Sequence, residues 1–401
     1  MHAVLEYLAV GILLVVVILA ADLMIEAPPR TIETVSAEQL YTVAERLIDK
    51  ILLTPGYPEN WGSDLLVDDE ITDFGLALHG ATAPYILDPD KVMRLANLTP
   101  LPNPMPINAE KIAELLGIKG KYGFKLEMRP MITAKILAID DTNYQTPLKF
   151  WVQVVNWQGI GLPNARVTGM YIMAYFQKGT AHTDLSDLKT ISETCITDTL
   201  GSCVLDFSDQ SQDIRGGKGD LPAVFIIIHI EWEGFTSVTG YSPVTEDEPV
   251  YGYIIGNYVF IERLEDATGA VIVKDEIVQA VPLYSLLLEP TDVEWCRAQP
   301  NDPMWCHEVA GRVLPSRRNQ GVNYLIGKVA YLERLSSHVM IFGQWKGRRI
   351  AVAVCRIPVI EIGYGGRAQP ANAVTVTRVA QIYNYPYLVR LTIWRLVEGS
   401  P

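Results

Sequence analysis

The chain has 401 residues, of which 49% are hydrophobic and 20% are charged, and its net charge is −13 because 33 Lys and Arg face 46 Asp and Glu. It is too apolar to be disordered and too long for one small core, which predicts two or three packed modules. Nucleic-acid binding without sequence preference requires a basic face, and no basic cluster longer than two residues occurs. We therefore expect no nucleic-acid partner.

An uncharged apolar run occupies the N-terminus. The run from Tyr7 to Ala21 has no charge, and with its apolar neighbours it exceeds 20 residues, enough to cross a bilayer as a helix. A cleaved secretory signal would show a basic start and a small-residue cleavage site, and neither is evident. The sequence therefore predicts a transmembrane helix over 1–27, with membrane lipid as a partner. Glu6 costs about 2–3 kcal/mol inside such a helix, so a functional role and an interfacial position both remain open.

The five cysteines bear on the compartment. Cys195 and Cys203 flank a turn-like stretch, so their thiols are expected to face each other across a hairpin. Cys296 and Cys306 bracket a loop rich in Pro and Asp. Two short-range disulfides and a free Cys355 favour an extracellular position for the bulk of a single-pass membrane protein. Five buried, reduced cysteines are the alternative.

Residues 28–130 predict short helices followed by an extended run. An S-x-x-Q capping box at Ser36 precedes an apolar stripe of helical period that stops at Thr54. Asp88 and Asn108 are expected to open two more short helices. The run YGFKLEMRP then reads as extended. This region is interpreted as a helical and mixed α/β module.

Two groups of segments carry a resemblance to a known family. The segment HAVLEYLAVGILLVVVILA resembles the assembly helix of type IV pilins, and AERLIDKILLTPGYPENWG, ITDFGLALHG, YILDPDKVMRLANL and LLGIKGKYGFKLEMRP resemble a run in archaeal pilin-like surface proteins. The resemblance covers about the first 130 residues. It implies that Glu6 pairs with the terminal amine of a neighbouring subunit as the helices bundle into a filament. Pilin precursors carry a basic leader before this helix, and only Met1 precedes His2 here, so a processed assembly helix and a permanent anchor both remain open.

The hydrophobic period changes to two from about residue 130. In AVFIIIHIEWE one face is apolar, and the other carries His229, Glu231 and Glu233. Residues 131–248, with their intervening turns, are similar to immunoglobulin-like or carboxypeptidase-regulatory-like sandwich modules. Residues 249–401 predict a second antiparallel β domain. The expected fold class is mainly β, with an N-terminal transmembrane α-helix, short helices and antiparallel β-sandwich modules.

No motif for catalysis or phosphate binding is present, so we expect no enzyme. The His229 strand face and the acidic stretch 64–73 are the candidate metal ligands, and Asp206, Asp209 and Asp213 form a weaker group. A solvated surface explains each group more simply. We expect no cofactor, with calcium at the acidic stretch as the alternative. Zinc is disfavoured because the sequence lacks C-x-x-C and paired His spacing.

The leading hypothesis is a cell-surface pilin-like structural subunit, either a minor or tip pilin or an adhesin, which associates with itself or with other pilin subunits in surface filaments. Glu6 would set the register, the helix face from Gly11 would pack against neighbours, and Trp61 would dock the helix to the first module. Asn97 is an N-glycosylation acceptor. The alternative is a statically anchored extracellular protein that binds a glycan, peptide or S-layer partner. An anchored hydrolase comes third.

Overall fold

The chain is mainly β, with several antiparallel sheets, which confirms the coarse fold class. This computed structural model describes residues 30–63, 70–95, 106–139, 146–176, 185–210, 223–242, 252–262, 266–276, 285–291, 293–296, 304, 306, 324–329, 336–345, 348–355, 359–366, 373–383 and 385–396. The predicted helix over 1–27, with Glu6 and Gly11, lies outside them. None of the helices formed by these residues is long and apolar enough to span a membrane.

The described residues of the N-terminal third of the chain form three α-helices. They are α2 (Arg30–Leu53), α3 (Pro89–Met93) and α4 (Ala109–Leu115), and a 3-10 turn, η2, covers Ser208–Gln210. Asp88 and Asn108 cap α3 and α4 as predicted, because each side chain accepts a hydrogen bond from a backbone N–H in the first turn. Helix α2 ends where the sequence predicts but begins before Ser36, so the capping box lies inside it.

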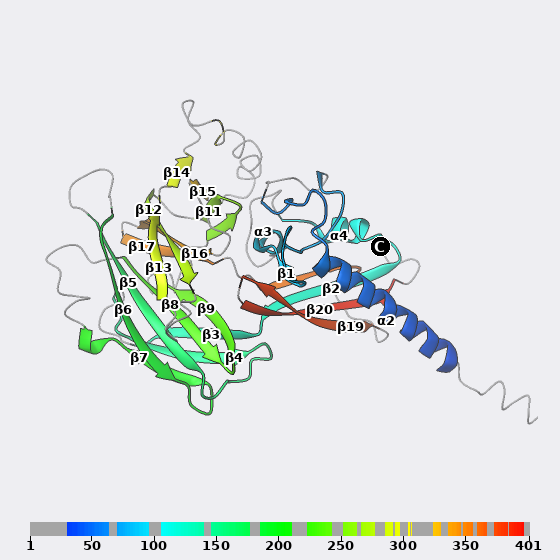
Figure 1. Ribbon diagram of the computed structural model, residues 1–401, viewed down its shortest axis with the longest axis horizontal. Coiled ribbons are helices and arrows are strands. Elements are labelled where there is room, and N and C mark those ends of the chain that lie inside the picture. The colour runs from blue at the N-terminus through cyan, green and yellow to red at the C-terminus, as the bar shows by residue number, and fades with distance from the viewer. Residues whose placement is uncertain are drawn as a thin grey trace, which may run out of the picture.

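Strands from both ends of the described chain form one five-stranded sheet, here called the terminal sheet. In spatial order its strands are β1 (Ile86–Leu87), β19 (Val374–Ile382), β20 (Tyr385–Arg395), β2 (Tyr122–Pro130) and β18 (Ile360–Tyr364). Strands β1 and β19 are parallel and the other pairs are antiparallel. Helix α2 lies across this sheet, and its N-terminal end points away from the rest of the molecule (Figure 1).

The pairing of β18, β19 and β20 corrects the predicted domain boundaries. Residues 249–401 are predicted to form one β domain, yet these three strands join β2 and β1 of the region 28–130. Hydrophobic alternation gives the face of a strand but carries no information about its partner. Met128 and Ile360 are register partners in β2 and β18, so everything between these two strands is an insertion between sheet neighbours.

The insertion begins with a β-sandwich. One sheet contains β3 (Ile132–Ala138), β4 (Lys149–Asn156) and β7 (Ser202–Asp206); the other contains β6 (Leu185–Ile196), β5 (Arg166–Phe176), β8 (Ala223–Trp232) and β9 (Phe235–Tyr241). Aromatic rings fill the space between the sheets, with Tyr171 and Phe207 centroids 5.2 Å apart and Phe150 at 6.1 Å from each. The sandwich prediction for this region therefore holds at the level of two packed antiparallel sheets.

A third layer covers the outer face of this sandwich. It is formed by β13 (Ser285–Thr291), β12 (Asp266–Glu276), β16 (Ser336–Trp345) and β17 (Arg348–Cys355). Phe225 and Ile227 of β8 belong to the same buried cluster as Phe342 of β16. His229 is consequently only 6% exposed, so the expectation of a solvated face on β8 is wrong there.

The last sheet contains β10 (Gly252–Ile255), β11 (Tyr258–Glu262), β15 (Tyr324–Val329) and β14 (Val293–Cys296). A disulfide joins Cys296 at the end of β14 to Cys306. A second disulfide joins Cys195 to Cys203. Strands β6 and β7, which carry these two residues, pair with different partners in different sheets. This bond therefore crosslinks the two sheets of the sandwich. The prediction that it spans a hairpin is wrong.

Candidate functional site

The loop between α2 and β1 is organised around Trp61. Its side chain is fully buried, and its indole N–H donates a hydrogen bond to the carbonyl of Gly75 at 3.1 Å. The guanidinium of Arg94 lies 5.5 Å from the indole centroid and donates to the Trp61 carbonyl. Trp61 belongs to the same core cluster as Ile48 and Ile51 of α2. It therefore packs in the core that α2 shares with the first module, whereas the apolar helix that Trp61 is predicted to dock lies outside the described residues.

A second buried cation fixes the same loop. The ammonium of Lys91 donates to the carbonyls of Pro55 at 2.8 Å and Ala77 at 3.0 Å, and it lies 3.8 Å from the carboxylate of Asp88. Burial lowers the pKa of Lys91, although the Asp88 charge opposes the shift. Burial raises the pKa of Asp88, and the nearby charge of Asp90 adds to this effect. Lys91 thus links the segment after α2 to the segment before β1.

These loops form one wall of a cleft of about 780 Å³, here called the polar cleft. The opposite wall comes from the turn between β10 and β11 and from β15, and β19 contributes its end. The polar and aromatic residues that line the cleft are Glu59, Asn60, Ser63, His79, Thr82, Asp88, Asp90, Asn257, Tyr258, Lys328, Gln381 and Tyr383. The cleft therefore combines side chains from the N-terminal module, the insertion and the C-terminal strands.

Close backbone contacts order the segments that line the polar cleft. Gly256 in the β10–β11 turn has φ +58°, and a Cβ at this position would lie 2.8 Å from the carbonyl oxygen of Ser63. On the other side, the backbone N–H of Gln381 donates to the carbonyl of Tyr85 at 2.8 Å. The backbone N–H of Val329 donates to the Asn257 carbonyl at 2.9 Å. The polar cleft is thus lined by backbone that is already hydrogen-bonded.

The charges in the polar cleft are of both signs. Glu59 and the ring of His79 are 3.0 Å apart, and both side chains are about half exposed. Asp90 is only 9% exposed. On the opposite wall, the ammonium of Lys328 lies 5.9 Å from the ring centroid of Tyr258. The lining can therefore accept and donate hydrogen bonds and presents aromatic surface.

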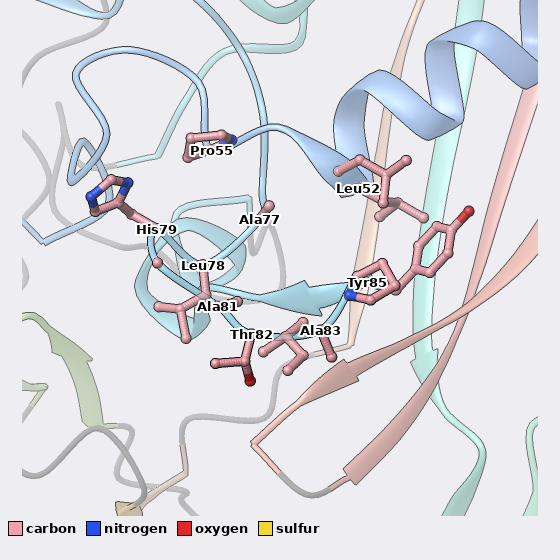
Figure 2. A pocket seen from close by; sticks show the side chains of 13 residues that line it. Leu52, Pro55, Ala77, Leu78, His79, Ala81, Thr82, Ala83 and Tyr85 are labelled. Atoms are coloured by element: carbon pink, nitrogen blue, oxygen red, sulfur yellow. The ribbon is translucent and has the colours of Figure 1, made fainter.

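A smaller pocket of about 380 Å³ lies beside the polar cleft and shares the loop that contains His79 and Thr82. Figure 2 shows His79 on one side of this pocket and Tyr85 with Leu52 on the other. Its remaining side chains are mostly small and apolar, including Ala77 and Pro84. It offers few groups that would orient a ligand, so the polar cleft is the stronger candidate site.

The predicted metal ligands do not converge in the part of the chain that the structure describes, where no group of three or more His, Cys, Asp or Glu residues has the spacing of a metal site. His229 lies 3.9 Å from Glu231. Asp73 pairs with Lys50 at 2.8 Å, and Asp206 pairs with Lys149. Glu70 and Asp209, the latter in η2, are exposed. The remaining acidic residues, Asp64, Asp68, Asp69 and Asp213, and also Asn97, lie outside the described residues.

No pattern in the sequence predicted the polar cleft. Its lining comes from segments near residues 60, 80–90, 257, 328 and 381, none of which carries a motif. The turn residues Asn257 and Gly256 mark a loop, but a loop pattern does not reveal what the loop faces. No protein-family model and no curated protein matches this chain.

Proposed function

We propose that this chain is a pilin-like structural subunit of the cell surface that assembles through its N-terminal apolar helix. The observation that carries the proposal is the placement of α2. This helix follows the apolar segment directly in the sequence, its N-terminal end points away from the sheets, and its later turns are fixed to the terminal sheet (Figure 1). Because α2 is packed on the terminal sheet, a bundle formed by the apolar segments of several subunits would also fix the position of each subunit's β-rich part, here called the head.

The docking of α2 has both an apolar and a polar part. Ala44 and Ile48 are fully buried in the same cluster as Ala380 of β19. Arg378 of the same strand lies 3.4 Å from both Glu45 and Asp49 on α2. The apolar contacts supply most of the stabilisation because ion pairs that are partly exposed contribute little. Together they support a helix with one fixed orientation on its sheet.

The inserted modules fit an extracellular head. We propose that the sandwich over 131–248 is an immunoglobulin-like module that projects from the assembly helix, and that membrane lipid and other pilin subunits are partners of the N-terminal helix. The two disulfides favour an oxidising compartment. The size of the head suits a minor or tip subunit or an adhesin better than a thin major pilin.

The test is incorporation into filaments sheared from producing cells. Glu6→Ala should leave expression and membrane insertion intact and abolish recovery in the filament fraction, because the intramembrane carboxylate would lose its partner amine. Glu38→Ala is the matched control, since Glu38 is exposed on α2. Normal incorporation of the Glu6 variant would contradict the proposal. Mass spectrometry of the native N-terminal peptide adds a second test, because assembly predicts a processed terminus.

A second candidate, an anchored binding protein, is favoured by the polar cleft. In that case the N-terminal segment is only a tether. Replacement of residues 7–21 by an unrelated apolar helix would then preserve surface display and ligand binding. The same replacement would abolish filament incorporation if the segment is an assembly helix, so one variant separates the two candidates.

A further inference from the structure

We infer that the polar cleft binds a neutral oligosaccharide segment of an extracellular glycan. The inference goes beyond pilin-like assembly, and it holds whether the N-terminal segment assembles or only anchors the chain. It rests on the chemistry of the lining, the balance of charge, the size of the cleft and the rigidity of its walls.

The hydrogen-bonding groups of the cleft match those of a sugar. A sugar hydroxyl both donates and accepts, so it is best met by side chains of both kinds. Asn60, Asn257 and Gln381 carry amides that donate and accept, and they approach from three separate segments. Asp90 adds carboxylate acceptors beside them. A ligand with many hydroxyls matches a lining that both donates and accepts hydrogen bonds better than an apolar ligand does.

Two tyrosines supply the apolar part of the recognition. Tyr258 and Tyr383 line the cleft, and each also packs against the main core cluster. Their rings are therefore held in place by the core. The C–H face of a pyranose ring is apolar and packs against such aromatic surface, while its hydroxyls reach the polar groups around the rim.

The charge balance favours a neutral ligand. Glu59 and Asp90 place two carboxyl groups along one wall, while the charge of Asp88 is opposed by Lys91. The two carboxyl groups disfavour anionic ligands such as phosphorylated or sulfated glycans. Lys328 on the facing wall opposes a strongly cationic ligand. The volume of about 780 Å³ lies within the roughly 300–1,000 Å³ range of ligand sites. It accommodates a short oligosaccharide segment rather than a single small ion.

The walls need little rearrangement before binding. The contact of Gly256 with Ser63 and the backbone hydrogen bonds of Asn257 and Gln381 fix the positions from which the amide side chains project. A preformed site loses less conformational entropy on binding than a flexible one.

The experiment uses the full chain in a detergent without a sugar headgroup, since a glycosidic detergent would compete. A glycan array with neutral, acidic and amino-sugar oligosaccharides is probed first, and the best neutral trisaccharide is then titrated by calorimetry. The test variant is Asn257→Ala/Gln381→Ala, because both side chains are exposed and their structural hydrogen bonds come from the backbone. The matched control is Thr377→Ala, an exposed residue of β19 outside the cleft.

The wild type should bind neutral glycans. The double variant should bind them about tenfold or more weakly, because two hydrogen bonds are lost. The control Thr377→Ala should bind as the wild type does. Thr82→Trp, which places a bulky group at an exposed cleft position, should also block binding, and this variant decides the matter if the double variant unfolds. Three outcomes overturn the inference: no glycan binds, only charged glycans or peptides bind, or the cleft variants bind normally. Glu6→Ala should retain glycan binding, so failure of the assembly proposal is distinguishable from failure of this one.

Discussion

Replacement of Lys91 by methionine tests whether a buried ammonium holds the loop between α2 and β1. Methionine has similar length and fills the same space without charge. The variant loses hydrogen bonds to the carbonyls of Pro55 and Ala77, each about 1.5–3 kcal/mol for a charged donor. Removal of the buried charge returns several kcal/mol of desolvation cost. We expect a net loss of about 1–3 kcal/mol in the free energy of unfolding at pH 7.

The assay is urea denaturation of the full chain from pH 7 to 11. Burial lowers the folded-state pKa of Lys91 below its usual 10.5. Between the folded-state and unfolded-state pKa values of Lys91, the unfolded chain binds one more proton than the folded chain. The free energy of unfolding of the wild type therefore has a component that rises with pH in this range. Lys91→Met should lack that component.

Lys50→Met is the matched control. Lys50 pairs with Asp73 at 2.8 Å, and both side chains are more than a third exposed, so its loss should cost less than about 1 kcal/mol. The reasoning is refuted if Lys91→Met is as stable as the wild type at pH 7, or if it keeps the alkaline rise in stability.

Two further predictions concern the sandwich. The Lys149 ammonium, with help from Ser208, lowers the pKa of Asp206 to about 2; Lys149→Met should therefore raise this pKa toward 3.8 in a carboxyl NMR titration. The wild-type pair should contribute only about 0.5 kcal/mol to the free energy of unfolding, since both groups are largely exposed. This contribution is present above pH 3.8 and is lost as the pH falls toward 2. An unchanged pKa of Asp206 in the variant would contradict the prediction. The double variant Cys195→Ala/Cys203→Ala, whose bond spans 8 positions, should lose about 2–3 kcal/mol in urea denaturation. Equal stability to the wild type would show that the crosslink between the two sheets contributes nothing.

Local signals in the sequence predict local structure well. The caps at Asp88 and Asn108 hold because the capping side chain and the N–H that it meets are two positions apart. The run YGFKLEMRP forms β2 with the predicted bounds, Tyr122–Pro130. The described strands between residues 132 and 241 form a sandwich, as the change to a hydrophobic period of two predicts, although β8 is buried on both faces.

The errors concern contacts that no local signal encodes. His229 is only 6% exposed, although the alternation in β8 predicts a solvated face there. Cys195 and Cys203 are close in sequence, yet their strands separate into two sheets. The polar cleft was not predicted because its lining residues are single polar side chains on distant loops. In each case the missing information is which elements pack together, and hydrophobic periodicity does not contain it.

The insertion between β2 and β18 explains how the candidate site arises. Because these strands are neighbours, the two ends of the insertion are about 4.7–4.9 Å apart, a spacing at which a long segment can be added without breaking the sheet. The insertion is not loosely tethered, since its Ile172 and Phe260 share a core cluster with the terminal sheet. One wall of the polar cleft belongs to the terminal sheet and its loops, and the other belongs to the insertion. A helix that fixes the terminal sheet to an assembly therefore also fixes the orientation of the cleft, so that assembly and ligand binding would share one rigid frame.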